Sequence, residues 1–440
     1  MMVGEKMFRL GGLHPSSHGT TVPDTTLWNA GLPSRIILPL HIDGLEPAAS
    51  LVKPGDQVRE GMEIGSAGSG GIPVHASLPG IVKDITTLQL PGVGECSGVV
   101  IDFKGAFDQL GKAPKIQEWH NTQPAKLISK LHSMGVVEPA FEEHNLVERL
   151  KKVAKKQLGN PRILVSLVDS DPLCMTEAVV SIRYAREIAQ ALEVLREILP
   201  GATIVFAYTR RSKDGAFATK KALQTLGFKV RLQKVSSAYP QYDYHHLVES
   251  VYSRELSLGM TAEDGGIFIV SPSALYSIYT AIVLGQPMIE RIVTLAGGAV
   301  TSPRVMKARL GTPLVELIRE SGKLKKMPEK IILGNSYRGK SVVSLTTPLS
   351  KEYTLVLALT SEEVNKAPTE ECIQCGQCAA HCPMGLEPIR LQKMISKKLY
   401  KHAKNEGLDL CTSCGICSAV CPSRIPLTQE LAKGKELLDG

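Results

Sequence analysis

Hydrophobic and polar positions follow four successive patterns along the 440 residues, and each pattern predicts its own unit. The first has short apolar runs between Gly and Pro turns, and the second alternates apolar runs with helical spacing. The third mixes both patterns, and the fourth sets short helical segments around cysteines. We expect a multidomain α/β protein with units at 1–115, 116–240, 241–360 and 361–440.

The first unit is expected to be a β-sandwich, with strands predicted by apolar runs at 35–40 and 98–103. Two phrases, Val-Lys-Pro-Gly-Asp from Val52 and Pro-Val-His-Ala-Ser-Leu-Pro-Gly from Pro73, resemble the two halves of a biotinyl or lipoyl domain. Such carrier domains bear a modified lysine just before the second phrase, but residues 66–71 contain no lysine. We therefore interpret the unit as a scaffold, not a swinging arm.

The second unit is expected to be Rossmann-like. Strands are predicted at 162–168, 203–208 and 229–232, and helices at 125–134, 146–158, 176–199 and 216–226. This βαβ alternation favours a mostly parallel sheet with helices on both faces.

The third unit is expected to include a small ubiquitin-like β-grasp of the SLBB type. Its predicted elements are a strand at 267–270, a helix at 272–284, a strand, turn and strand at 291–300, and a helix at 312–321 that opens with Thr-Pro. The fourth unit is expected to be a helical dicluster ferredoxin domain.

Composition excludes several classes of protein. Hydrophobic residues make up 43% of the chain and charged residues 21%, which excludes a mainly disordered chain or a coiled-coil rod. The first residues have no apolar core for export, and polar residues and Pro272 interrupt the apolar stretch 266–284. We expect a cytoplasmic protein whose contact with a membrane is peripheral. The formal charge of +8 suits an acidic partner but decides nothing alone.

Eight of the ten cysteines lie in two copies of the run C-x2-C-x2-C-x3-C-P, which is the bacterial ferredoxin run for [4Fe–4S] clusters. Three thiolates two residues apart, on a loop helped by Gly376 or Gly415, wrap one cluster. The fourth thiolate lies on the following turn and ligates the other cluster. The run therefore predicts two clusters, the first held by Cys372, Cys375, Cys378 and Cys421, and the second by Cys382, Cys411, Cys414 and Cys417.

The alternative for these cysteines is a pair of zinc knuckles, because CxxC pairs also bind zinc tetrahedrally. Zinc leaves the repeated C-x3-C-P spacing unexplained, so we favour the clusters. Cys96 and Cys174 have no cysteine neighbours and are interpreted as inert thiols. No catalytic side chain is predicted.

Six basic residues lie between the two runs, and no acidic residue occurs from 388 to 405. The six are Arg390, Lys393, Lys397, Lys398, Lys401 and Lys404. They fit a solvated helix face, and they also fit a docking face for an acidic electron carrier steered by charge. The sequence leaves both interpretations open.

Together these features resemble the RnfC family, whose members are peripheral components of the Rnf-type ion-translocating ferredoxin oxidoreductase complex. The resemblance covers nearly the whole chain. Besides the β-sandwich phrases and the cysteine runs, it includes phrases that begin at Gly11, Leu38, Gln286, Gly311 and Thr347. It implies a peripheral subunit on the cytoplasmic side of a cell-membrane complex. It also implies a middle domain similar to the flavin-binding subunit of respiratory complex I, which commonly binds FMN and reacts with NADH.

The chain departs from this family at the flavin loop. Relatives have Gly-Gly-Ala-Gly-Phe-Pro there, and its glycines let backbone N–H groups approach the FMN phosphate. Residues 134–141 keep only Gly135 and place the acidic Glu138 in the loop. Three more family phrases are weakened, at 169–172, 239–242 and 334–339. We therefore expect neither tight FMN binding nor NADH use.

The resemblance implies an electron-transfer subunit that receives electrons from reduced ferredoxin, or another one-electron carrier. It would pass them through two [4Fe–4S] clusters to membrane partners that move Na⁺ or H⁺. The expected partners are the other subunits of the complex and ferredoxin, with no nucleic acid. The alternatives are an FMN-dependent NADH:ferredoxin oxidoreductase module, and a soluble iron–sulfur adaptor of a cytosolic reductase.

Overall fold

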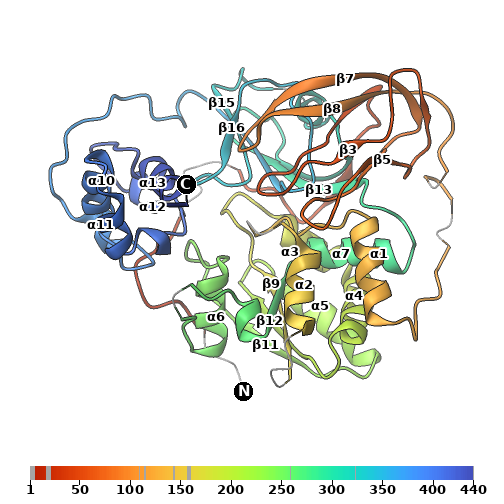
Figure 1. Ribbon diagram of the computed structural model, residues 1–440, viewed down its shortest axis with the longest axis horizontal. Helices are drawn as coiled ribbons and strands as arrows, with labels where there is room; N and C mark the ends of the chain where they lie inside the picture. The colour runs from red at the N-terminus through yellow and green to blue at the C-terminus, as the bar shows by residue number, and fades with distance from the viewer. Residues whose placement is uncertain are drawn as a thin grey trace.

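The computed structural model describes residues 5–15, 21–108, 110–112, 115–141, 144–155, 160–257, 259–322 and 324–439. Figure 1 shows the β-rich and mixed units on one side of the α/β unit, with the C-terminal helices in blue standing beside them. Among the described residues, no helix is long and apolar enough to cross a membrane.

The N-terminal unit is built from two antiparallel sheets. One has the order β2 (Arg35–Pro39), β8 (Gly94–Phe103), β7 (Gly80–Leu90), β4 (Gln57–Val58), and the other has the order β3 (Ala49–Ser50), β5 (Glu63–Ser66), β6 (Val74–His75). Their alternating apolar residues, such as Ile36, Ile64 and Ile101, meet in one core. Gly80 is required where the strands pass, because a Cβ there would lie 2.1 Å from the carbonyl oxygen of Asp102. The β-rich prediction is confirmed.

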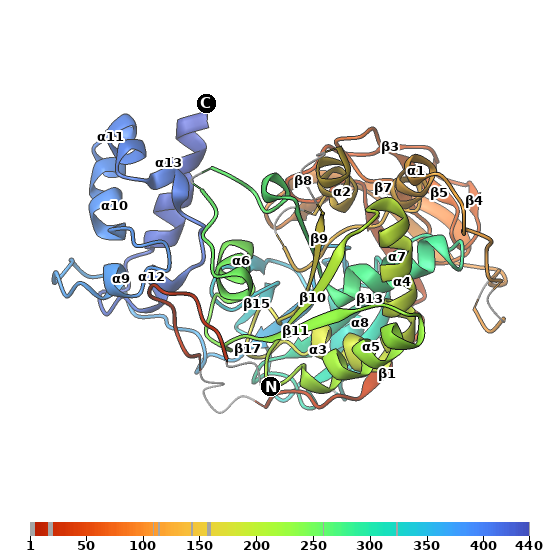
Figure 2. The ribbon, with the colours of Figure 1, turned by 90° about the horizontal axis from the view of Figure 1, so that it is seen from below.

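The α/β unit is a parallel sheet with helices on both faces. Its strand order is β11 (Val230–Lys234), β10 (Thr203–Tyr208), β9 (Arg162–Leu167), β12 (Ile267–Val270). One face packs against α1 (Pro124–Ser133), α2 (Leu146–Lys155), α3 (Thr176–Arg183), α4 (Ala185–Ile198), α5 (Lys213–Thr225) and α7 (Pro272–Ile282). The other face is covered by α6 (Tyr244–Tyr252), as Figure 2 shows.

Two details of this unit differ from the sequence prediction. The predicted helix 176–199 is two helices, because the backbone of Tyr184 leaves helical geometry. The centroid of the Tyr184 ring lies 4.1 Å from that of Tyr276 on α7. In addition, β12 pairs with β9, so β12 and α7 belong to the α/β sheet instead of the unit expected to start at 241. Both features depend on contacts between segments that are distant in the sequence, and local sequence patterns do not reveal such contacts.

The mixed unit is a six-stranded sheet. Its order is β1 (Leu27–Asn29), β14 (Arg304–Arg309), β13 (Glu290–Ala296), β17 (Leu355–Leu359), β15 (Lys330–Leu333), β16 (Lys340–Val342), and α8 (Leu314–Glu320) packs on it. The central strands β13 and β17 are parallel. The strand–turn–strand predicted at 291–300 is instead β13 followed by a loop, and the second strand starts at Arg304.

The C-terminal unit consists of short helices around the cysteine runs. They are α9 (Gln377–Ala380), α10 (Pro388–Ser396), α11 (Tyr400–Asn405), α12 (Ile416–Ala419) and α13 (Leu427–Asp439), with 3₁₀ turns at Leu408–Leu410 and, in the α/β unit, at Glu263–Gly265. Leu386, Leu391, Leu408 and Leu431 form its small core.

Candidate functional site

The two cysteine runs have the same backbone conformation. In each, the second residue after the first cysteine has a positive φ, 57° at Gln374 and 51° at Ser413. In each, that residue's N–H donates to the first cysteine's sulfur over 3.4 Å, to Cys372 Sγ and to Cys411 Sγ. Gly376 and Gly415 then adopt left-handed geometry at the start of α9 and α12. The sequence repeat is therefore also a structural repeat.

The structure brings together the second predicted ligand set. Its four thiols line one pocket with apolar neighbours such as Ile416 and Leu431; they are Cys382, Cys411, Cys414 and Cys417. Burial raises the pKa of Cys414 to about 12 and that of Cys417 to about 11. These thiols fit a metal cluster, because bound iron supplies the positive charge that ionises a thiol in apolar surroundings.

The first predicted set is more open to solvent. Burial raises the pKa of the Cys378 thiol, and the neighbouring Cys421 adds to the rise. Cys375 is exposed and Cys372 is half-buried on the loop that precedes α9. Among the described residues, no three His, Cys, Asp or Glu side chains are placed to hold a single metal ion, so the four thiols of the second set share a pocket without meeting at one point.

The two loops have different surroundings. Ile373 in the first loop is 67% exposed, and a Cβ on Gly376 would meet nothing within 4 Å. In the second loop, a Cβ on Gly415 would lie 2.2 Å from the carbonyl oxygen of Tyr337, and Ile416 is buried in the core of the α/β unit. The second loop is thus packed against the body of the protein, while the first faces solvent.

Two tyrosines and an arginine that were not predicted as site residues hold the second loop. The Tyr239 hydroxyl donates to the carbonyl of Cys414 over 2.5 Å, and its ring lies 4.4 Å from that of Tyr337. Arg338 donates to the carbonyl of Thr412 over 3.5 Å. All three belong to weakened flavin phrases, so the sequence located them but gave no sign of this contact.

The N-terminal segment also holds the second ligand set. Leu13 exchanges two backbone hydrogen bonds with Tyr239, and the Gly12 N–H donates to the carbonyl of His381, next to Cys382. A Cβ on Gly11 would lie 2.6 Å from the Cys382 carbonyl oxygen. The Gly-Gly-Leu phrase was the sequence signal for this close approach.

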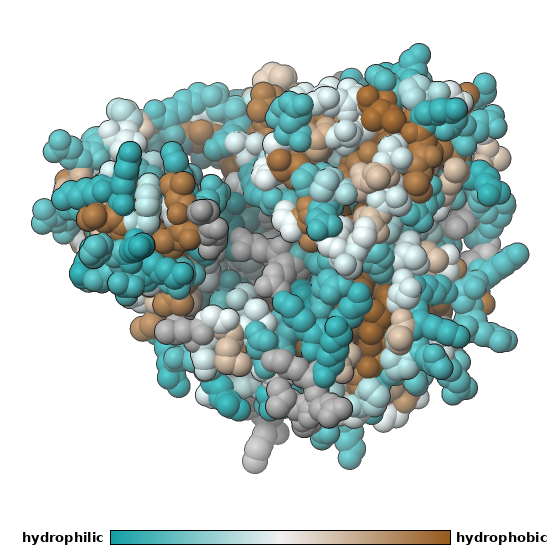
Figure 3. All heavy atoms as spheres, in the orientation of Figure 1, coloured by the Kyte–Doolittle hydropathy of each residue, from teal (hydrophilic) through white to brown (hydrophobic). Residues whose placement is uncertain are grey.

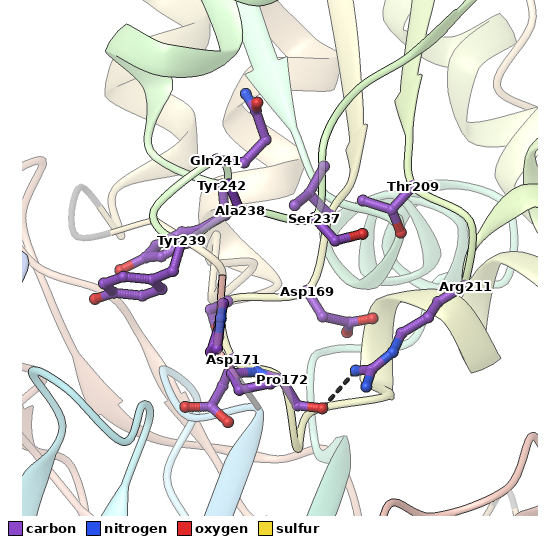
Figure 4. A pocket seen from close by; sticks show the side chains of 13 residues that line it. Asp169, Asp171, Pro172, Thr209, Arg211, Ser237, Ala238, Tyr239, Gln241 and Tyr242 are labelled. Carbon is purple, nitrogen blue, oxygen red and sulfur yellow. Dashed lines mark hydrogen bonds between the residues drawn. The ribbon is translucent and has the colours of Figure 1, made fainter. Parts of the chain in front are cut away.

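The four weakened flavin phrases meet beside the second loop. A cavity of about 310 Å³ is lined by parts of 134–141 and 334–339, by Ser170 and Tyr242, and by the charged residues Asp43, Lys340 and Glu352. A smaller cavity of about 110 Å³ shares Ser170 and Tyr242 and is lined by Asp169, Asp171 and Arg211 (Figure 4). The four phrases, far apart in the sequence, thus line two neighbouring cavities.

Burial raises the pKa of acidic side chains that line these two cavities. Burial raises the pKa of Asp169 to about 7, and Figure 4 shows the Asp169 and Arg211 side chains pointing toward each other. Asp171 accepts a 2.7 Å hydrogen bond from the Ser336 N–H. Glu352 is 4% exposed, burial raises its pKa to about 7, and its Oε2 has no hydrogen-bond partner among the described residues.

The sequence placed Glu138 in the flavin loop, but its side chain does not line either cavity. Its fully buried carboxylate accepts hydrogen bonds from the Ser271 N–H at 2.9 Å and the Ser271 hydroxyl at 2.6 Å. It thus holds Ser271, the residue that caps the start of α7, and burial raises the pKa of this carboxyl.

The loop at 134–141 does not fit a flavin phosphate. The N–H of Ala140 is already donated to Glu138 over 3.1 Å, and Pro139 has no N–H. Gly135 serves packing instead, because a Cβ there would lie 2.7 Å from the carbonyl oxygen of Pro73.

The basic stretch lies on the outside of the C-terminal unit. Arg390 is paired with Glu387 and Glu406, whereas Lys393, Lys397, Lys398, Lys401 and Lys404 are exposed. The face of this unit seen in Figure 3 is mostly hydrophilic. The other two cysteines lie elsewhere, Cys174 buried beside Thr294 and Cys96 on β8.

Two family models match the chain. Residues 7–106 match the RnfC barrel sandwich hybrid domain, and residues 367–425 match the 4Fe-4S dicluster domain. The barrel-sandwich and dicluster predictions are therefore confirmed at this level.

Curated relatives match along nearly the whole chain. The C subunit of the proton-translocating ferredoxin:NAD(+) oxidoreductase complex of Clostridium ljungdahlii is 26% identical over 91% of this chain and 87% of its own length. The C subunit of the ion-translocating oxidoreductase complex is 29% identical in Vibrio cholerae and 28% identical in Rhodobacter capsulatus. These matches cover 91% and 97% of this chain, and 51% and 82% of the relatives, so the chain spans about half the length of the Vibrio protein.

Among solved structures, the chain is similar to NAD⁺-reducing [NiFe]-hydrogenase in the H2-reduced state, with a TM-score of 0.51 and 11% identity. The match covers 72% of this chain and 61% of the hydrogenase chain. At this identity the likeness concerns the fold alone.

Proposed function

Because this chain is related over nine tenths of its length to RnfC-type proteins of ion-translocating oxidoreductase complexes, we propose that it is the electron-transfer subunit of such a complex. It would take electrons from reduced ferredoxin or a similar acidic carrier and pass them to membrane partners that move Na⁺ or H⁺. It would lie on the cytoplasmic face of the cell membrane as a peripheral subunit. The observation that carries the proposal is the doubled cysteine run within a matched dicluster domain.

Two [4Fe–4S] clusters would supply one-electron transfer in this chain. We assign the first to Cys372, Cys375, Cys378 and Cys421, and the second to Cys382, Cys411, Cys414 and Cys417. The grouping of the second four thiols around one pocket supports this assignment. Cys96 and Cys174 would take no part.

The different surroundings of the two loops suggest their order in electron transfer. The first loop is open to solvent, so an external carrier can come close to it. The second loop is held by Tyr239 and Tyr337 against the body, so it would serve the interior of the complex. The exposed lysines on α10 and α11 and between them would attract the acidic carrier toward this unit.

A second candidate is an FMN-dependent NADH:ferredoxin oxidoreductase module. The cavity of about 310 Å³ at the family's cofactor position favours it. The occupied N–H of Ala140 argues against a phosphate cradle, so we propose that FMN does not bind tightly. A soluble adaptor of a cytosolic reductase is the third candidate.

The division of the chain into units also belongs to this proposal. We assign the sheet built on parallel β13 and β17, with α8, to an SLBB-like β-grasp. The α/β unit would run through α7, and the dicluster unit would occupy about 361–440.

One measurement separates the three candidates. Anaerobically purified protein should contain about eight irons, because each of two cubes holds four. It should also contain a similar amount of acid-labile sulfide and no flavin. Stoichiometric FMN with rapid reduction of the clusters by NADH would support the second candidate. Stoichiometric zinc without visible absorption would exclude all three. Failure to co-purify with membranes would support the soluble adaptor.

A further inference from the structure

A large hollow lies at the end of the α/β sheet where its strands begin, opposite the cavities described above. It has a volume of about 860 Å³ and is bordered by the first residues of three parallel strands: Arg162 of β9, Thr203 of β10 and Val230 of β11. The cavity that contains Asp169, Thr209 and Ser237 follows the other ends of these strands. The hollow is therefore separate from the proposed redox site.

Five basic side chains line this hollow, which we call the arginine hollow: Arg162, Arg196, Lys229, Arg231 and Arg254. No acidic side chain lines it among the described residues, and none of the five forms an ion pair with a described acidic residue. The formal excess of the whole chain is only +8, so five positive charges in one hollow are a marked concentration. Like charges repel one another and destabilise a fold unless an anion neutralises them.

Aromatic rings hold three of these guanidinium groups in place. The guanidinium carbons of Arg162 and Arg231 lie 5.2 Å and 5.7 Å from the centroid of the Tyr252 ring, and that of Arg196 lies 4.6 Å from the Phe228 centroid. Arg231 also donates to the carbonyl of Val251 over 3.0 Å. Guanidinium groups fixed in this way lose little freedom when they bind carboxylates, so the hollow is prepared for an anionic partner.

We propose that the arginine hollow receives an acidic segment of a protein partner. Four of its five cations are arginines, the basic residue enriched in protein–protein interfaces, where lysine is depleted. The hollow is concave and open, which fits a protruding chain segment better than a flat lipid surface. Its rings already contact guanidinium groups, so a stacked base would have to displace these contacts.

The proposal is tested with a synthetic octaglutamate peptide and the full-length protein. The lysines of the C-terminal unit would also attract this probe, so the background for all measurements carries Lys397→Gln, Lys398→Gln and Lys401→Gln. In that background we expect the peptide to bind at low salt. Adding Arg231→Gln and Arg254→Gln should weaken binding by about ten-fold for each guanidinium lost, because each loses a charged hydrogen bond to a carboxylate. Both side chains are exposed, so the fold should tolerate these changes.

A matched control and two other probes make the test decisive. Lys53→Gln with Lys126→Gln removes two exposed charges elsewhere and should leave peptide binding unchanged. Equal losses in both double variants would show general charge attraction and overturn the proposal. So would absence of peptide binding. Preferential binding of inorganic tripolyphosphate, or of phosphatidylglycerol vesicles, through Arg231 and Arg254 would overturn it in favour of a phosphate or lipid site.

Discussion

The hydroxyl of Tyr239 donates a hydrogen bond to the backbone carbonyl of Cys414, across 175 residues of sequence and 2.5 Å of space. Tyr239 is 4% exposed, and its backbone is paired with Leu13. Tyr239 therefore contacts both the N-terminal segment and the second cysteine run, and it also lines the smaller of the two cavities. The corresponding cysteine of the first run, Cys375, is exposed.

The variant Tyr239→Phe should lower the midpoint potential of the cluster at the second run and leave the first unchanged. A donor near the cluster stabilises its more negative reduced form, and the variant removes this donor. Loss of one hydrogen bond should also cost about 1 kcal/mol of stability. Redox titration followed by electron paramagnetic resonance measures both potentials in one sample. Tyr279→Phe, on α7, is the control; an unchanged second potential in Tyr239→Phe would contradict the assigned contact.

Single replacements of the cysteines should show that each cluster takes ligands from both runs. Cys382→Ala should lose the same cluster as Cys414→Ala, and Cys421→Ala the same cluster as Cys375→Ala. Each variant should fall from about eight irons to about four, because one cube of four is lost. The resonance spectrum of the remaining cluster identifies which one survived. If Cys382→Ala instead loses the same cluster as Cys375→Ala, each run binds its own cluster. The control variant Cys96→Ala should keep all the iron.

The sequence predicted what depends on spacing along the chain, and it missed what depends on packing between units. The cysteine runs are local, so their backbone repeat at Gln374 and Ser413 follows from the repeated letters. The contact of Tyr239 with Cys414 joins distant segments and has no local pattern. Glu138 was assigned to a cofactor loop because of its position, but its carboxylate is used by Ser271 at the start of α7. The pairing of β12 with β9 was missed for the same reason.

Buried carboxyl groups should make the protein less stable as pH rises. Glu177 is 2% exposed and accepts hydrogen bonds from the Ser273 N–H at 2.9 Å and the Ser273 hydroxyl at 2.7 Å. Burial, and then Asp169, raise its pKa to about 8, whereas a carboxyl in an unfolded chain titrates near about 4.3. The folded state therefore keeps a proton that the unfolded state loses. Stability from this group is full below about pH 4 and is lost as pH rises toward about 8.

The variant Glu177→Gln keeps a neutral side chain of the same shape, so its stability should fall less between pH 5 and 8. The difference in slope can reach about 1.4 kcal/mol per pH unit, the value for one proton. Urea unfolding of both proteins at several pH values measures it. Glu197→Gln, an exposed change on α4, should follow the wild type. Parallel profiles for Glu177→Gln and wild type would mean that Glu177 is ionised in the fold.

Charge reversal of the exposed lysines should slow electron delivery by an acidic carrier. Lys397→Glu, Lys398→Glu and Lys401→Glu invert three exposed charges of the C-terminal unit, while Arg390 is already paired with Glu387 and Glu406. Electrostatic steering changes association rates by about 10- to 1,000-fold at low salt. We expect stopped-flow reduction by ferredoxin to slow by that order in the triple variant.

Salt and the choice of donor distinguish docking from damage to the clusters. The variant and wild type should converge as salt rises, because the Debye length falls to about 3 Å at 1 M. Reduction by a small uncharged donor should be equal in both proteins, since the cysteine ligands are untouched. Reversal of Lys53, Lys104 and Lys126, three exposed lysines on other units, makes the same change in net charge and is the control. Equal ferredoxin rates at low salt would reduce this stretch to a solvated helix face, and the carrier would then have to recognise the exposed loop around Ile373 without help from these lysines.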